Sequence, residues 1–184
     1  MEPQIMIFIV AILVIILVIE YNIIQRKHNN IKNAYGTLDV MLKKRYDLIP
    51  NLVNCVKGYM EHEKSTLEMI TKLRNRVDSV KNKEEIFDIN NYFHESLQKI
   101  NILAESYPDL KANENFMYLQ KVLYDVEENI SASRRTYNAH VTDYNNFIMM
   151  IPNNLFAKIF GFKQMPLFSI SKNERKGKIW YNEK

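Results

Sequence analysis

The four histidines are the residues that would most readily give this chain metal chemistry. A di-iron site in a helical protein needs Glu-x-x-His pairs, in which a carboxylate precedes the imidazole by three residues on one helix face. The residues three positions before the histidines are Gln25, Tyr59, Asn91 and Tyr137, and none of these is acidic. His62 and Glu63 are adjacent, but Thr66 stands where the H-E-x-x-H zinc motif needs its second histidine. We therefore interpret His62 and Glu63 as a polar core pair, and we expect no metal, no cofactor and no enzymatic activity.

Cys55 and the pair Arg134–Arg135 are the other side chains considered for chemistry. A single cysteine excludes an internal disulfide and suits a reducing compartment. Cys55 lies beside an apolar helix stripe, so we expect an inert thiol. The two arginines are either a solvated surface pair or partners of Glu63 or Glu127 in a buried network that determines helix register.

The side chains from Ile5 to Ile19 are fifteen consecutive apolar residues. A helix that spans a bilayer needs about 20 residues, and the stretch from Pro3 to Ile24 has this length with few polar interruptions. The competing interpretation is a cleaved signal peptide, which has a basic start and a small-residue cleavage site. Neither feature is present, so we expect an uncleaved transmembrane anchor over residues 1–24.

Positive charge is concentrated beside this anchor and in the C-terminal tail. The net charge is +4; residues 25–45 hold six basic side chains and one acidic one, and residues 152–184 hold seven basic and two acidic ones. The positive-inside rule then places the N-terminus outside and the body in the cytoplasm of a bacterial inner membrane, with a single pass. The same distribution favours an anionic lipid bilayer, rather than nucleic acid, as a partner.

The remainder of the chain has the apolar spacing of long helices and no strand pattern. Four helices are expected, over about 25–45, 48–80, 84–106 and 113–151. Asp47 would cap the second helix with Pro50 in its first turn, and Asn113 would cap the fourth. Short connections favour an all-α, antiparallel up-down-up-down four-helix bundle over residues 25–151, followed by a basic, aromatic tail over 152–184. The alternative is that Pro50 only kinks one very long helix.

Two Asp-Leu blocks are the most specific motifs. The first reads Tyr46-Asp47-Leu48-Ile49-Pro50-Asn51-Leu52, and the second reads Tyr107-Pro108-Asp109-Leu110. Together with Tyr21-Asn22, Tyr144-Asn145 and Gly161-Phe162, they make the chain resemble the LemA family over nearly its whole length. One departure is Tyr35, where the family usually has tryptophan. The resemblance implies a membrane-anchored helical bundle and supplies no catalytic residues.

Both blocks would be turns at the membrane-distal end of such a bundle. They are either capping residues, with Asp47 and Asp109 each contributing about 1 kcal/mol, or part of a surface that docks a partner. The residues of this predicted docking surface are Tyr46, Asp47, Pro50, Asn51, Tyr107, Pro108, Asp109 and Asn113.

After Pro152 a short amphipathic helix is expected, capped by Asn153 or Asn154 and ended by Gly161. It either lies in the membrane interface or folds back over the open end of the bundle. The residues concerned are Leu155, Phe156, Lys158, Ile159, Phe160 and Phe162. Lys172 to Lys178 and Trp180-Tyr181 would extend the membrane contact.

Two functions fit these features. The first is a non-enzymatic scaffold or interaction module in the cytoplasm that organises other membrane proteins. The alternative is a ligand-binding sensor bundle on the outer face of the membrane. Membrane topology distinguishes them.

Overall fold

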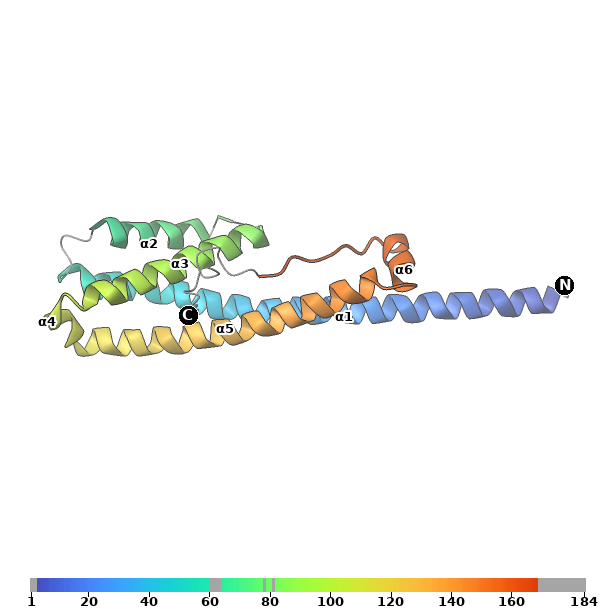
Figure 1. The fold of residues 1–184 in the computed structure, drawn as a ribbon, viewed down its shortest axis with the longest axis horizontal. Helices are drawn as coiled ribbons and strands as arrows, with labels where there is room; N and C mark the ends of the chain where they lie inside the picture. The colour runs from blue at the N-terminus through green and yellow to red at the C-terminus, as the bar shows by residue number, and fades with distance from the viewer. Residues whose placement is uncertain (1–2, 60–63, 78, 81, 169–184) are drawn as a thin grey trace, which may run out of the picture. The chain divides into compact units, whose positions relative to one another are not determined.

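The computed structural model describes residues 3–59, 64–77, 79–80 and 82–168. All regular structure in these residues is helical (Figure 1), and it comprises α1 (Pro3–Lys57), α2 (Lys64–Val77), α3 (Lys83–Ala104), α4 (Pro108–Lys111), α5 (Glu114–Met149) and α6 (Asn153–Ile159). The all-α expectation is confirmed for these ranges. The predicted His62–Glu63 pair and the tail residues Lys172–Lys178 and Trp180-Tyr181 lie outside the described residues.

Helix α1 is 55 residues long and continues through Pro50 without a break. The predicted turn between two helices at residues 45–48 is therefore wrong. Proline inside a helix removes one hydrogen bond and costs roughly 3 kcal/mol. The apolar stripe on both sides of Pro50 compensates, because Tyr46, Ile49 and Leu52 are all buried and each fully buried apolar side chain contributes roughly 1.5–3 kcal/mol. Asp47 consequently lies exposed in mid-helix and caps nothing.

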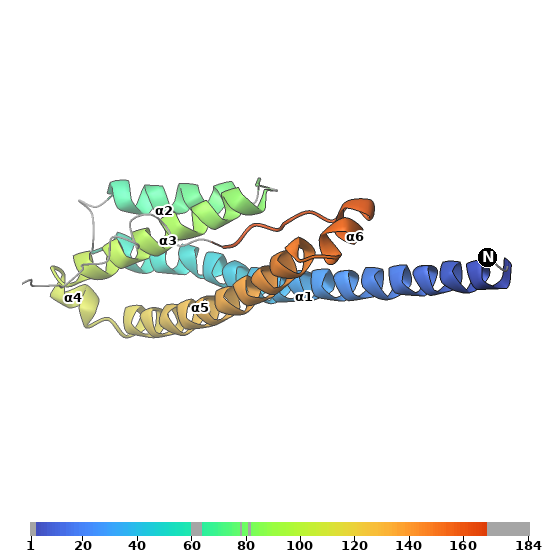
Figure 2. The same ribbon diagram turned by 45° about the vertical axis from the view of Figure 1, so that its right-hand side comes forward.

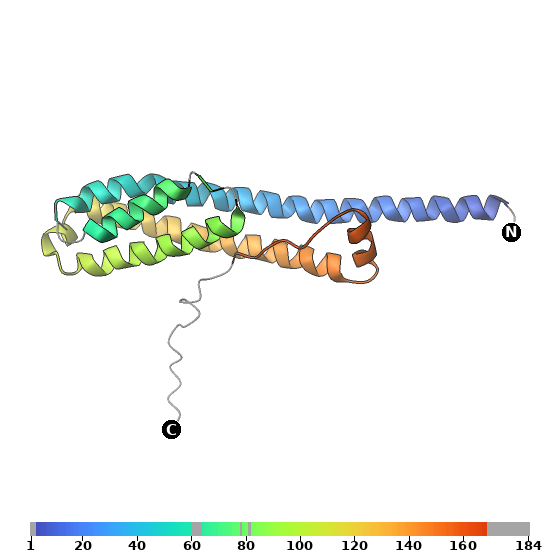
Figure 3. The same ribbon diagram turned by 90° about the horizontal axis from the view of Figure 1, so that it is seen from above.

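The chain divides into two compact units, and α1 and α5 contribute to both. The first consists of Met1–Leu38 and Ala132–Leu167. There, α1 packs against the C-terminal part of α5 through a Tyr35–Tyr137 ring contact and an ion pair between Lys27 and Asp143. Residues 162–167 are extended and run back alongside α5 after the short α6 (Figure 3).

The second unit contains Asp39–Ser131 and Phe168. Helices α2 and α3 lie side by side (Figure 2), and side chains of α1, α2, α3 and α5 form the core. Its members include Leu42, Ile49, Leu52, Val56, Leu67, Ile70, Phe93, Leu97, Ile100, Phe116, Leu123 and Val126. Most of these belong to the helical stripes that the apolar spacing predicts.

The helix ends test the predicted caps. The prediction for Asn113 is confirmed, because its Oδ1 accepts the backbone N–H of Phe116 at 3.1 Å, at the start of α5. Gly161 ends α6 with φ +73°, and the Phe162 N–H donates to the Ala157 carbonyl as in a Schellman motif. The N-cap residues of α4 and α6 are Tyr107 and Pro152, without side-chain capping bonds, so the predicted caps Asp109, Asn153 and Asn154 are wrong.

These caps give a matched pair of substitutions. Asn113→Ala should lower the free energy of unfolding by about 1 kcal/mol, because it leaves first-turn N–H groups of α5 without an acceptor. Asp47→Ala should change it by less than about 0.5 kcal/mol, because Asp47 is exposed and caps no helix. Unfolding followed by circular dichroism in detergent measures both values. Equal losses for the two variants would contradict this assignment.

Candidate functional site

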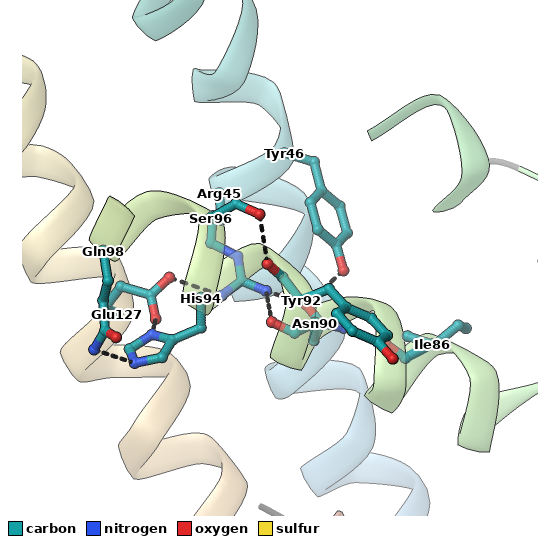
Figure 4. A network of polar contacts seen from close by, with 9 residues as sticks. All are labelled: Arg45, Tyr46, Ile86, Asn90, Tyr92, His94, Ser96, Gln98 and Glu127. Atoms are coloured by element: carbon teal, nitrogen blue, oxygen red, sulfur yellow. Dashed lines mark hydrogen bonds and ion pairs between the residues drawn. The ribbon is translucent and has the colours of Figure 1, made fainter. Parts of the chain in front are cut away.

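Arg45 is a buried cation in the core of the second unit, with 1% of its surface exposed. It lies between α3 and α5 (Figure 4). Its Nη1 donates to Glu127 Oε1 at 2.7 Å, and its Nη2 donates to Asn90 Oδ1. The guanidinium also lies 5.4 Å from the ring centroid of Phe93, close enough for a cation–π contact. Three helices are therefore joined through one side chain.

Two further side chains complete this network. The Tyr46 hydroxyl donates to Asn90 Oδ1 at 2.6 Å, and the Asn90 amide donates to the Ile86 carbonyl at 2.7 Å. Burial raises the pKa of Tyr46, and the nearby charge of Arg45 opposes this effect only in part. The phenol is therefore neutral and acts as a donor.

His94 holds the second carboxylate oxygen of Glu127. Its Nδ1 lies 3.1 Å from Glu127 Oε2, and its Nε2 lies 3.0 Å from the side-chain nitrogen of Gln98. An ionised carboxylate only accepts hydrogen bonds, so Nδ1 carries a proton and donates a hydrogen bond to Glu127. The imidazole is thus oriented from both sides.

Opposing effects determine the charge of Glu127. Burial raises the pKa of its carboxyl, but hydrogen bonds and charge from His94 and Arg45 outweigh burial and lower that pKa from 4.5 to about 2. Glu127 is therefore ionised at neutral pH, and the buried positive charge of Arg45 has a full counter-charge. The network is suited to holding helices in register, a documented role of buried ion pairs.

A separate groove of about 500 Å³ lies between α1 and the start of α5 in the same unit. We call it the amide groove, and it is lined by Asn51, Asn54, Cys55, Asn113, Asn115, Tyr118 and Leu119. The Cys55 thiol lies 3.9 Å from Asn113 Oδ1. Burial raises the pKa of Cys55, which disfavours the reactive thiolate.

The predicted membrane-interface residues divide into two groups in the first unit. Phe160 and Phe162 are half-buried against Tyr21 of α1, with ring centroids 5.2 and 6.0 Å away, and Phe156 is also half-buried. Leu155, Lys158 and Ile159 are exposed. The segment thus packs against α1 on one side and presents apolar side chains to the surroundings on the other.

Residues 163–166 are attached to α5 by side-chain bonds that the sequence did not predict. The Tyr144 hydroxyl donates to the Lys163 carbonyl at 3.0 Å, and the Tyr137 hydroxyl donates to the Pro166 carbonyl at 2.9 Å. Asn145 both donates to and accepts from the backbone of Met165, each at 2.9 Å. Tyr144-Asn145, part of the family motif, is therefore a clamp for the C-terminal strap, residues 162–167.

Comparison with known proteins identifies the fold family. The model of the LemA family matches residues 34–179. The chain belongs to the LemA family. Protein LemA of Metamycoplasma hominis is 26% identical over 155 residues, covering 84% of this chain and 71% of that protein. The resemblance drawn from the Asp-Leu blocks is thereby confirmed.

Two magnetosome proteins are also similar. MamQ of Magnetospirillum gryphiswaldense is 29% identical over 76 residues, covering 41% of this chain and 28% of that protein. MamQ 2 of Paramagnetospirillum magneticum is 22% identical, covering 83% of this chain and 65% of that one. The chain thus spans less than two thirds of these MamQ proteins. The family and the apolar start of α1 together describe a membrane-associated helical protein.

The structure separates the predicted docking residues of this LemA-family chain. Asn51 and Asn113 line the amide groove. Tyr46 is buried in the Arg45 network, whereas Asp47 and Pro50 are exposed on α1. The second block, Tyr107, Pro108 and Asp109, forms the turn into α4. Only this second block is a turn, so the premise of two matching turns is wrong, and a docking role stays a prediction.

The buried network bears on the open question of Arg134 and Arg135. The partner found for Glu127 is Arg45; Arg134 and Arg135 have interactions of their own, and a pairing of either with Glu63 lies outside the described residues. A signal was present in the sequence, because Arg45 follows Leu42 by three residues and precedes Ile49 by four. This spacing puts a charged residue on the apolar stripe. Among the described residues, no group of three or more His, Cys, Asp and Glu side chains could hold a metal ion.

Substitutions at Arg45 and Glu127 test the network. Arg45→Leu and Glu127→Leu should each lower the free energy of unfolding by about 3–5 kcal/mol, because each leaves one charge without its partner. The double variant should lose much less than the sum, because no unpaired charge remains. Thermal unfolding by circular dichroism measures the cycle, and additive losses would contradict the pairing.

The pH dependence of stability provides the control for that cycle. Since the folded-state pKa of Glu127 is depressed to about 2, its contribution is present above pH 4.5 and is lost as the pH falls toward 2. It is on the order of 3 kcal/mol. The double variant should lack this part of the loss of stability in acid. If the double variant instead loses as much stability in acid as the unsubstituted protein, Glu127 is not the titrating group.

Proposed function

We propose that this LemA-family protein is a single-pass, non-enzymatic scaffold whose helical body binds another protein beside the membrane. The continuity of α1 carries the proposal. Its side chains from Ile5 to Ile19 are mostly exposed and apolar, whereas Ile24, Ile31 and Leu38 further along are fully buried. Soluble proteins rarely expose an apolar surface as long as this one to water. The same helix therefore serves as anchor and as core element.

The body is an antiparallel up-down-up-down bundle in this proposal. The four helices are the C-terminal part of α1, then α2, α3 and the N-terminal part of α5. Contacts between α2 and α3 support it, together with the bonds of Arg45 to α3 and α5. A bundle joined by a buried ion pair suits a scaffold, because it holds its surface in one arrangement.

The amide groove is the docking surface in this proposal, and an extended segment of a partner protein is its occupant. Asn51, Asn54 and Asn115 each carry one amide donor group and one carbonyl acceptor, whereas the side-chain amide of Asn113 is already hydrogen-bonded to Tyr59 and Phe116. The main chain of an extended peptide offers the same two groups in alternation. Tyr118 and Leu119 add apolar contact, and no charged side chain lines the groove to demand a charged ligand.

Topology distinguishes the scaffold from an outer-face sensor. The basic residues after the anchor support a cytoplasmic body in a bacterial inner membrane. A C-terminal green fluorescent protein fusion should fluoresce, and a C-terminal alkaline phosphatase fusion should be inactive. The reverse pattern would exclude the cytoplasmic scaffold and favour the sensor.

Photo-crosslinking in intact cells tests the docking surface with a matched control. Tyr118 lines the groove, whereas Tyr124 on the same helix does not, and the two are 68% and 70% exposed. With p-benzoylphenylalanine in place of Tyr118 we expect a discrete protein adduct, and in place of Tyr124 we expect none.

Substitution of the groove amides makes the test specific. In the protein that carries p-benzoylphenylalanine at position 118, the further substitutions Asn54→Ala and Asn115→Ala should abolish the adduct. The circular dichroism spectrum should be unchanged, because both residues are exposed. An adduct of equal yield at position 124, or one that persists without the two amides, would overturn the groove as the docking surface.

A further inference from the structure

A group of exposed apolar side chains lies at the end of α5, in the connection that follows it and on α6, in the first unit. We call it the α6 surface, and its members are Met149, Met150, Ile151, Leu155 and Ile159, which are 51–84% exposed. Leu155 and Ile159 are four residues apart, so they occupy one face of α6. The opposite side of α6 holds Ala157, which is buried. Exposed apolar side chains gathered in so short a stretch of chain are typical of an interaction surface.

The contacts of Tyr21 give the level of this surface along α1. Tyr21 follows the last residue of the apolar run, Ile19, by two positions, which is about 3 Å along the helix axis. Phe160, the residue after Ile159, packs edge-on against Tyr21, and Phe162 also contacts it. If Ile5–Ile19 occupies the hydrocarbon, Tyr21 lies at the headgroups, as aromatic residues in spanning helices commonly do. The contacts then place α6 at the same level.

Further contacts hold α6 there. Phe162 lies 6.2 Å from the ring of His28, which is about two turns beyond Tyr21 on α1. The clamp formed by Tyr144 and Asn145 secures the strap that follows. The exposed apolar face of α6 is therefore held beside the end of the apolar segment of α1. If that segment spans a bilayer, lipid lies next to this face.

We propose that the α6 surface is immersed in the lipid interface of the leaflet from which α1 emerges. Met149, Met150, Ile151, Leu155 and Ile159 contact acyl chains near the headgroups, and Lys158 extends to lipid phosphate. This is the arrangement of an interfacial amphipathic helix, with an apolar face in the boundary region and a basic side chain at its edge. The proposal needs α1 to span the bilayer, but it is independent of the orientation of the protein and of the docking groove.

Depth-dependent quenching in nanodiscs tests the proposal on the full chain. The discs contain equal amounts of phosphatidylcholine and phosphatidylglycerol and one protein chain each. Bimane is attached at Leu155→Cys or Ile159→Cys in a Cys55→Ser background. The control is Ile102→Cys in α3, because Ile102 and Ile159 are both 70% exposed. Phosphatidylcholine with a doxyl group near the headgroup end of an acyl chain is the quencher.

We expect the doxyl lipid to lower the fluorescence of the two α6 labels by about half, as for a group at the acyl boundary, and to leave the Ile102 label unchanged. Quenching of the α6 labels no stronger than that of the Ile102 label overturns the proposal. Labels shielded from both doxyl lipid and aqueous iodide would show that the protein itself covers the surface, which also overturns it.

A variant that introduces negative charge on α6 gives a second readout. Leu155→Asp with Ile159→Asp should release α6 from the lipid, so that bimane at Ile151→Cys loses its quenching by doxyl lipid and becomes accessible to iodide. Ile102→Asp with Val40→Asp is the control, because these side chains have similar exposure in the second unit. Phe160 is left intact, because an aspartate there would remove the ring contact with Tyr21 and destabilise the protein whether or not α6 contacts lipid. Unchanged lipid quenching in the α6 variant contradicts the proposal.

Discussion

The buried charge of Arg45 is the constraint on which the second unit depends. An ion of this size taken out of water costs several kcal/mol unless it is paired and hydrogen-bonded. Glu127 supplies the counter-charge and Asn90 supplies a second acceptor. Because these groups belong to α1, α3 and α5, the three helices meet correctly only in the register that brings them together. Apolar stripes alone tolerate sliding, whereas this set of polar groups does not.

The first unit is organised by a different boundary, the end of the apolar segment of α1. Tyr21 lies there, and Phe160 and Phe162 pack against it. The segment that follows α5 therefore contacts α1 just beyond the end of its apolar run. The segment after α5 thus folds back on α1 while Leu155 and Ile159 of α6 stay exposed.

Particular residues show why some features followed from the sequence and others did not. The cap formed by Asn113 involves Phe116 only three residues away, so local chemistry was sufficient to predict it. Pro50 was expected to begin a helix, because proline favours a first turn. Burial of the stripe that includes Tyr46 and Ile49 outweighed that local preference. The bonds of Tyr144 to the strap could not be predicted, because they join residues 19 positions apart without a periodic pattern.

By itself, the sequence determined the helical class, the apolar segment, the family and most of the residues that form the core, because each depends on composition or on a spacing of three and four. Only the tertiary structure decided that α1 continues to Lys57, that Arg45 pairs with Glu127, and that Asn51 and Asn113 line one groove. The physical reason is the same in each case. These features depend on free energies of burial and pairing between groups distant in sequence, and the positions of such groups are determined only when the helices pack.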